Sequence, residues 1–362
     1  MRTASRSGSI KLGIFAFAKG IGIILVILTH TFAHLDSEQS TSLCLIKMLV
    51  GCTKAGLMPM FFVISGFGLI KRAPGKMLKK TFSELVIPYL WVMAAYAVIF
   101  PLTYCYAAYD GQWEPTIDRT LQYLVAFVLG IGANGTVVFG YETAWCTAAW
   151  FFLALFVALN VLNLILRNKN TAAQIACVIL CLILGAVLFH FNFFFYCIPQ
   201  GLMAVGYCYV GYTLKRYRLL DQLQSCKWLY LILLPTFFAE LIGGYFDLCS
   251  GQFRNIFLDY LGAGCSGILL MLLGIHFGKQ EWKGLNGIKQ LGLYTYWIFA
   301  IHAVEMEALP WWYWEKKWTR NPWAVLVLEL AIKSLIFFIC CTLLKANIKH
   351  QYSRKTKKEK HK

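Results

Sequence analysis

Ten stretches of the chain are apolar over about the 20 residues that a helix needs to cross a bilayer. They lie near residues 12–33, 49–70, 82–104, 146–166, 172–191, 194–214, 228–246, 255–277, 290–309 and 323–344. The composition agrees, because hydrophobic residues make up 59% of the 362 residues and charged residues only 14%, against about 45–50% and about 25% in soluble domains. We therefore predict an all-α integral membrane protein, a bundle of ten transmembrane helices.

An eleventh apolar segment, residues 120–140, is ambiguous, because its four glycines weaken a helix. The basic residues decide between the two topologies. With a cytoplasmic N-terminus and ten spans, 25 of the 34 Lys and Arg residues lie inside and seven outside, as the positive-inside rule requires. An additional span would place the basic C-terminal segment outside. We expect residues 120–140 to form a short external re-entrant or surface segment, and both termini to be cytoplasmic.

The formal net charge of +17 comes mainly from the same basic residues on the cytoplasmic side. In a soluble protein it would suggest nucleic-acid binding. Here it reflects topology together with a polybasic tail that anionic lipid attracts. We predict a membrane domain over residues 1–344, a basic cytoplasmic tail over residues 345–362, membrane lipid as a partner and no nucleic-acid partner. The sequence does not indicate the oligomeric state.

The thirteen cysteines do not form a recognisable framework. Their number is odd, no two of them make a CxxC pair, and several lie inside apolar runs. We interpret most of them as small buried hydrophobic residues. The sequence therefore predicts neither a disulfide scaffold nor a metal site.

Two ionisable residues lie in the first apolar stretch, KGIGIILVILTHTFAHLD. Lys19 and His30 are eleven residues apart, so a helix places them on one face with a rise of roughly 16 Å between them. Ionisable groups inside spans are costly and indicate function. A histidine can act as a base near neutral pH or carry an acyl group itself. The alternatives are snorkelling for Lys19 and an interhelical hydrogen bond for His30.

Further polar residues fall at helix breaks and turns. Ser65 and Gly66 interrupt the aromatic run MPMFFVISGFG, where they permit close helix packing or supply donors to an oxyanion. Glu142 and Trp145 lie in the external segment, where they could bind a sugar. Glu329 and Lys333, at positions i and i+4, are expected to pair on one helix face. A short cytoplasmic turn carries five cations, which can bind phosphates: Lys71, Arg72, Lys76, Lys79 and Lys80.

Three of these segments together resemble the acyltransferase-3 family of membrane O-acyltransferases: KGIGIILVILTH, PMFFVISGF and the basic turn that ends in IPY. The branch with the greatest similarity is the one of fucose 4-O-acetylase-like proteins and polysaccharide acetylases. AWFFLALFVALN, IPQGLMAVGYCYVGYTL and LGLYTYWIFAIHAVE continue the resemblance in the expected order. His30 matches the family's first-span histidine, Lys19 its first-span basic residue, which is more often Arg, and His302 its late-span histidine.

The resemblance implies transfer of an acyl group, usually acetyl, from cytoplasmic acyl-CoA to a hydroxyl of an extracytoplasmic or lipid-linked glycan at the plasma membrane. The acyl-CoA would be a co-substrate, with no tightly bound cofactor. His30 and Lys19 would be catalytic. Ser65, Glu142, Trp145 and His302 would contact the acceptor, and the five cations of the turn would bind CoA phosphates, with Lys215, Arg216 and Arg218 as a second possible cluster. The alternative function is a transporter or flippase for a glycan or a lipid-linked sugar, which also uses buried charges and broken helices.

Overall fold

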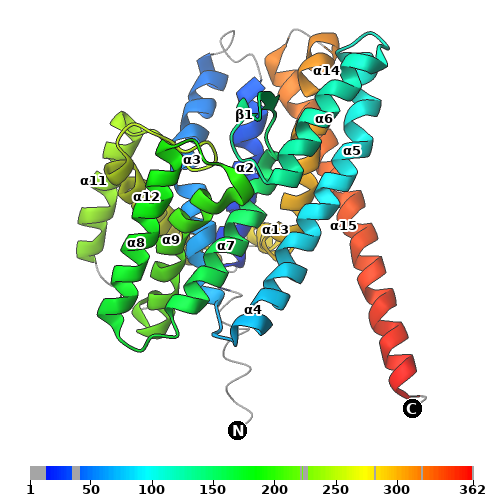
Figure 1. The fold of residues 1–362 in the computed structure, drawn as a ribbon. Coiled ribbons are helices and arrows are strands. Elements are labelled where there is room, and N and C mark those ends of the chain that lie inside the picture. Colours follow the sequence, from blue (N-terminus) through cyan, green and yellow to red (C-terminus); the bar gives the residue numbers. More distant parts are fainter. Residues whose placement is uncertain are drawn as a thin grey trace.

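The computed structural model describes residues 14–34, 41–220, 222, 227–280, 283–318 and 321–360. Its helices form one bundle (Figure 1). In chain order they are α2 (Ala16–His34), α3 (Thr41–Gly68), α4 (Pro74–Thr81), α5 (Ile87–Ala107), α6 (Trp113–Leu129), α7 (Trp150–Ile165), α8 (Thr171–His190), α9 (Ile198–Arg216), α11 (Lys227–Gly243), α12 (Ile256–Gly278), α13 (Lys283–Ala308), α14 (Trp311–Trp318) and α15 (Pro322–Lys360). This confirms the predicted all-α membrane class.

Short elements connect some of these helices. The π-helical segment η1 (Phe82–Val86) joins α4 to α5, and the 3₁₀ turns η2 (Thr147–Ala149) and η3 (Phe195–Cys197) precede α7 and α9. Strands β1 (Thr136–Val138) and β2 (Tyr141–Thr143) pair as an antiparallel hairpin before α7. A second antiparallel hairpin, β3 (Phe246–Asp247) with β4 (Gln252–Phe253), joins α11 to α12.

Seven of the described helical segments are long and apolar enough to cross a membrane. Each corresponds to one of the predicted stretches, and the segment Pro74–Ala107 runs from α4 through η1 into α5. The predicted stretches at residues 194–214, 228–246 and 290–309 became α9, α11 and α13, which fall outside these seven. The count of ten spans therefore remains a prediction.

The packing of α9 and α13 gives a reason for their lower hydropathy. Helix α9 packs against α3, α7 and α8, and α13 packs against α2 and α5. A helix that other helices surround has less need of a uniformly apolar surface than one that faces lipid. Glycines allow the closest approach: a Cβ on Gly66 would lie 1.9 Å from the carbonyl oxygen of Cys208, and one on Gly211 would lie 1.9 Å from that of Val63. Gly66 therefore acts in helix packing, as expected.

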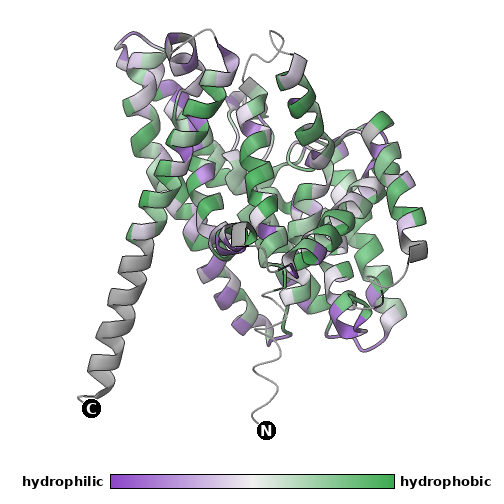
Figure 2. Ribbon diagram, turned by 180° about the vertical axis from the view of Figure 1, so that it is seen from behind, coloured by the Kyte–Doolittle hydropathy of each residue, from purple (hydrophilic) through white to green (hydrophobic). Residues whose placement is uncertain are grey.

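The two ends of the bundle carry different elements. The N-terminal end of α2, helix α4 and the C-terminal end of α15 point to one end of the bundle, and α14 lies at the other (Figure 1). Hydrophilic residues gather towards the two ends and hydrophobic residues cover the helices between them (Figure 2). Helix α6 starts near α14, and the β1–β2 hairpin lies towards that same end (Figure 1). Residues 120–140 comprise the C-terminal part of α6, strand β1 and the residues around that strand, and their role as a re-entrant or surface segment stays a prediction.

Candidate active site

Two histidines from distant parts of the chain meet near the α14 end of the bundle. The imidazole of His30, in α2, lies 5.2 Å from that of His302, in α13, between ring centroids. His302 is fully buried, and its Nδ1 lies 2.7 Å from Oε1 of Glu305, one turn further along α13. No described residue is within hydrogen-bond reach of its Nε2. The sequence predicted both histidines as site residues, and the structure brings them together.

The other side of His30 faces a cavity of about 250 Å³. Trp145, Lys54 and Asp247 also line it, and they come from the segment before η2, from α3 and from strand β3. This volume is slightly below the range of about 300–1,000 Å³ that is typical of ligand pockets. The cavity therefore has room for one small group rather than for a whole acyl-CoA molecule. Trp145 was a predicted site residue, and it lies beside His30.

Lys19 lies on the same face of α2 as His30, nearer the opposite end of the bundle. The continuous helix Ala16–His34 holds both residues, so their separation is roughly 16 Å along the axis. Ile23 and Val26 occupy the same face between them and are 1% and 3% exposed. Packed aliphatic side chains therefore fill this face of α2 between the lysine and the histidine. An acyl arm that follows this face would have to displace them.

Ser65 and Glu142 lie apart from the two histidines. The hydroxyl of Ser65 donates to the backbone oxygen of Phe61, one turn earlier in α3, at 2.8 Å. Glu142 is an exposed residue of strand β2, opposite Val137 in the hairpin. Neither residue lines the cavity beside His30. Their predicted contact with an acceptor is therefore not supported by proximity to His30.

The five cations of the predicted CoA-binding turn lie around α4, at the end of the bundle opposite α14 (Figure 1). Lys76 and Lys79 are exposed on α4. Lys80 forms an ion pair with Glu84 at 2.5 Å. Lys71 donates to the backbone oxygen of Leu166 at 2.9 Å. The backbone of Arg72 is held at both its N–H and its carbonyl by the side chain of Asn163.

The second possible basic cluster lies beside the first. The ammonium of Lys215, at the end of α9, donates to the backbone oxygen of Leu69 at 3.2 Å, two residues before Lys71. The ammonium of Lys71 lies 5.8 Å from the ring centroid of Tyr212, one turn earlier in α9. The two clusters, which the sequence offered as alternatives, therefore form one basic surface at this end of the bundle.

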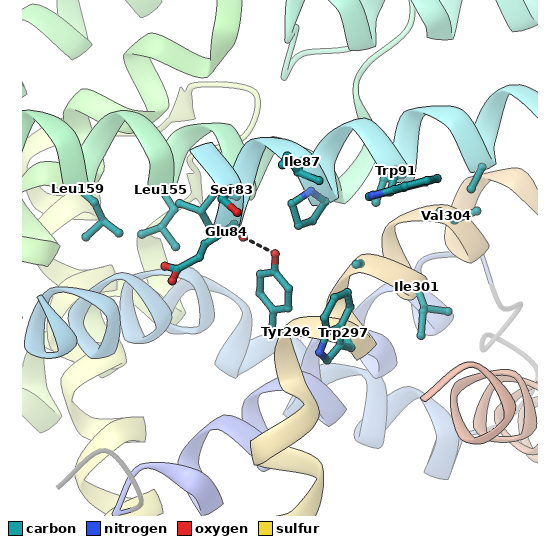
Figure 3. Close-up of a pocket in the computed structure, with 15 residues that line it drawn as sticks. Ser83, Glu84, Ile87, Trp91, Leu155, Leu159, Tyr296, Trp297, Ile301 and Val304 are labelled. Atoms are coloured by element: carbon teal, nitrogen blue, oxygen red, sulfur yellow. Dashed lines mark hydrogen bonds between the residues drawn. The ribbon is translucent and has the colours of Figure 1, made fainter. Parts of the chain in front are cut away.

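Neither histidine lines the two larger apolar cavities. A groove of about 970 Å³ runs between η1 and α5, α7 and α13, and its lining includes Trp91, Tyr296 and Trp297 (Figure 3). The hydroxyl of Tyr296 donates to the backbone oxygen of Glu84, in the π-helical segment. Another groove, of about 730 Å³, lies between α2, α13 and α15 and reaches Lys333. Both are lined mainly by apolar side chains.

The identity of the chain follows from a comparison with known protein families. The model of the acyltransferase-3 family, described as an acyltransferase domain, matches residues 15–346. The chain belongs to this family. It is therefore a membrane acyltransferase. A search of curated proteins and a search of solved structures each found no match.

Sequence reasoning missed several residues of the candidate site. Glu305 lies at i+3 from His302, a spacing that could have identified it, since both side chains then share a helix face. Lys54 and Asp247 gave no such signal, because their nearness to His30 depends on how α3 and the β3–β4 hairpin pack. Within the described part of the chain, no group of three or more His, Cys, Asp or Glu residues could hold a metal ion.

Cys249 also lines the cavity of the acyltransferase and could be mistaken for a nucleophile. Its Sγ donates to the backbone oxygen of Gly132 at 3.0 Å. Burial, together with the carboxylate of Asp247, raises the pKa of the Cys249 thiol well above its usual value. The thiolate is the nucleophilic form of cysteine. The thiol of Cys249 is therefore neutral at physiological pH and is a poor candidate for carrying the acyl group.

Proposed function

We propose that this acyltransferase moves an acyl group, most simply acetyl, from cytoplasmic acyl-CoA to a hydroxyl of an extracytoplasmic or lipid-linked glycan. We place it in the plasma membrane with both termini in the cytoplasm, and in the branch of fucose 4-O-acetylase-like and polysaccharide acetylases. The observation that carries the proposal is the position of His30, between a small cavity and the buried pair of His302 and Glu305.

The chemistry requires a base, because an alcohol is a weak nucleophile at neutral pH. His30 removes the proton of the acceptor hydroxyl while the hydroxyl oxygen attacks the thioester carbonyl and forms the new C–O bond. The tetrahedral intermediate then collapses, the C–S bond breaks, and the CoA thiolate takes the proton from His30. An imidazole is suited to both transfers, since it can accept and return a proton near neutral pH. The alternative route acylates His30 first and transfers the group in a second step.

The acceptor would lie in the cavity beside His30. The half-buried ring of Trp145 offers an apolar face, and Asp247 and Lys54 offer a hydrogen-bond acceptor and a donor. Oδ1 of Asp247 already accepts from the backbone N–H of Cys249 at 3.0 Å, which fixes the carboxylate in place. A few fixed polar groups in an otherwise apolar pocket are typical of sites that bind a small ligand in one orientation.

The donor would bind at the opposite end of the bundle. CoA carries several phosphate charges, and the basic surface of α4 and the end of α9 provides cations for charge-assisted hydrogen bonds. Lys19 lies between this surface and His30 along α2. Its ammonium would therefore attract the anionic donor towards His30. The roughly 16 Å from Lys19 to His30 would be spanned by the extended thioester arm, with displacement of the side chains that fill this face.

The function can be tested with inside-out membrane vesicles that contain the protein and a labelled acetyl-CoA supplied from outside. We expect the label to enter the glycan fraction as a base-labile ester, and the same vesicles with His30→Ala to leave the glycan unlabelled. A transporter or flippase would move the glycan across the membrane without labelling it. If the protein moves the glycan across the membrane of these vesicles while no label enters the glycan, the proposal is overturned in favour of that alternative.

A further inference from the structure

Glu305 belongs to a buried ionic cluster that joins three helices behind the active-site histidines. The ammonium of Lys333, in α15, lies 3.6 Å from Oε1 of Glu305 and 2.7 Å from Oε1 of Glu329. It also donates to the hydroxyl of Thr31, in α2, at 2.9 Å. The side chains of these four residues are at most 3% exposed. We call His302, Glu305, Glu329 and Lys333 the Glu305 cluster.

The carboxylate of Glu305 is held from both sides. Its Oε1 lies 2.7 Å from Nδ1 of His302, and its Oε2 accepts from the indole N–H of Trp311, in α14, at 2.8 Å. The ring of Trp311 in turn lies 4.9 Å from the ammonium of Lys333. Hydrogen bonds to a carboxylate are stronger than neutral ones. Both oxygens of Glu305 are therefore fixed, and the ring of His302 is oriented by its bond to one of them.

The orientation of His302 leaves one ring nitrogen without a protein partner. Nδ1 is bound to Glu305, whereas Nε2 is buried with no hydrogen-bond partner among the described residues. A buried polar atom without a partner is rare in native structures and requires an explanation. The ring of His302 lies beside that of His30, so a reacting group bound between the two rings could supply this partner.

An oxyanion donor at Nε2 requires the doubly protonated form of His302, and the carboxylates around the ring can balance its charge. Two carboxylates and one ammonium give a formal charge of −1, and a proton on His302 brings the total to zero. An uncompensated charge away from water is costly. The doubly protonated ring donates to Glu305 through Nδ1–H and has Nε2–H left as a second donor. A donor in this position would face the oxygen on which negative charge develops during acyl transfer.

We propose that Glu305 is a positioning residue: it orients His302 so that Nε2–H donates to the oxyanion of the tetrahedral intermediate formed beside His30. When the acceptor hydroxyl attacks the carbonyl carbon, the carbonyl electron pair moves to its oxygen, which accepts the hydrogen bond from His302. No proton is transferred to the oxyanion, and the bond weakens when the carbonyl re-forms and the thiolate leaves. Lys333 and Trp311 hold Glu305 in place. This inference rests on the proposed function.

The test compares Glu305→Gln, His302→Gln and the double variant in the full-length enzyme. Gln can still accept from Nδ1 but removes the negative charge that balances the doubly protonated ring. Loss of an oxyanion donor lowers kcat by about 10²–10³-fold, so we expect a loss of this order in Glu305→Gln, with little change in the KM for acetyl-CoA. Because Glu305 acts through His302, the double variant should be no slower than His302→Gln alone.

Three controls separate this role from a purely structural one. Glu305→Asp, which keeps the charge, should recover part of the lost kcat. Glu307→Gln changes another carboxylate of α13, which accepts from the hydroxyl of Tyr123, and should leave kcat near that of the wild type. The thermal unfolding temperature of detergent-purified Glu305→Gln should stay close to the wild-type value.

Two outcomes would overturn the inference while the proposed function stands: wild-type kcat in Glu305→Gln, or losses that multiply in the double variant. If the wild-type enzyme labels no glycan in the vesicle assay, the proposed function itself fails, and the comparison of variants is then decided on hydrolysis of acetyl-CoA. Equal hydrolysis by the wild type and Glu305→Gln would count against the positioning role in that case as well.

Discussion

The imidazole rings of His30 and His302 lie 5.2 Å apart, centroid to centroid, although they belong to the first and the second-last of the long described helices. One ring lines a cavity, and the other is buried and bound to Glu305. Two imidazoles in such different environments are suited to different tasks in one reaction, since the environment decides which ring accepts a proton and which donates a hydrogen bond.

His30→Ala should abolish detectable acetylation while the protein remains in the membrane at its normal level. Removal of a general base typically lowers the rate by about 10²–10⁴-fold. The measurement is the initial rate of glycan labelling, normalised to the amount of protein by immunoblot. His190→Ala is the matched control, because His190 is exposed at the end of α8. Wild-type acetylation in His30→Ala, or a loss that only follows the amount of protein, would contradict the catalytic role.

Lys19→Arg should keep most of the activity, and Lys19→Ala should lose most of it. Arg retains the positive charge at this position, and the family more often has Arg there. Loss of an interaction worth about 1.4 kcal/mol corresponds to a tenfold change, so we expect kcat/KM for acetyl-CoA to fall by about tenfold or more in Lys19→Ala. If Lys19→Ala and Lys19→Arg behaved alike, the charge of Lys19 would have no part in the reaction.

The double variant Lys79→Ala, Lys80→Ala should raise the KM for acetyl-CoA, by about two- to fivefold per lysine, as expected for exposed ion pairs. Salt screens such contacts, so the KM of the wild type should also rise with ionic strength. Lys317→Ala, at the end of the bundle marked by α14, should change neither property. An unchanged KM in the double variant would mean that CoA binds instead to the adjoining part of the same basic surface, at Lys215, Arg216 and Arg218.

Cys249→Ala should acetylate glycan at close to the wild-type rate. Since its pKa is raised, the thiol of Cys249 stays protonated as the pH increases through the range in which an ordinary cysteine ionises. Alkylation by iodoacetamide at pH 8, followed by mass spectrometry, should therefore be slow at Cys249 and faster at Cys44, which is exposed. A labelled acyl group recovered on Cys249 would show that the acyl group passes through this thiol.

Reporter fusions after Asn170 and after Lys362 should both indicate the cytoplasm. This follows from the asymmetry of the basic residues and agrees with the position of α4 and the C-terminal end of α15 at one end of the bundle (Figure 1). A fluorescent protein should be active at each site and alkaline phosphatase inactive, so that each reporter serves as the control for the other. An extracytoplasmic signal at Asn170 would contradict the ten-span topology.

Part of this architecture could be predicted from local spacing. Runs of apolar residues predict spans because a bilayer requires about 20 of them per helix, and seven of the predicted stretches became helices of that kind. The shared face of Lys19 and His30 and the pairing of Glu329 with Lys333 follow from the helical repeat alone, and the pair is formed at 2.7 Å. The motifs of the first three segments were sufficient to identify the acyltransferase-3 family.

The meeting of residues from different helices could not be predicted in this way. The approach of His302 to His30, the contact of Lys333 with Thr31 and the place of Asp247 at the cavity all depend on which helix faces pack together. A helical repeat fixes where a side chain lies around its own axis but not which neighbour that face meets. The sequence by itself determined the membrane class, the family and the candidate histidines. Only the tertiary structure, through the packing of α2, α13, α14 and α15, decided which acid supports His302 and which groups surround His30.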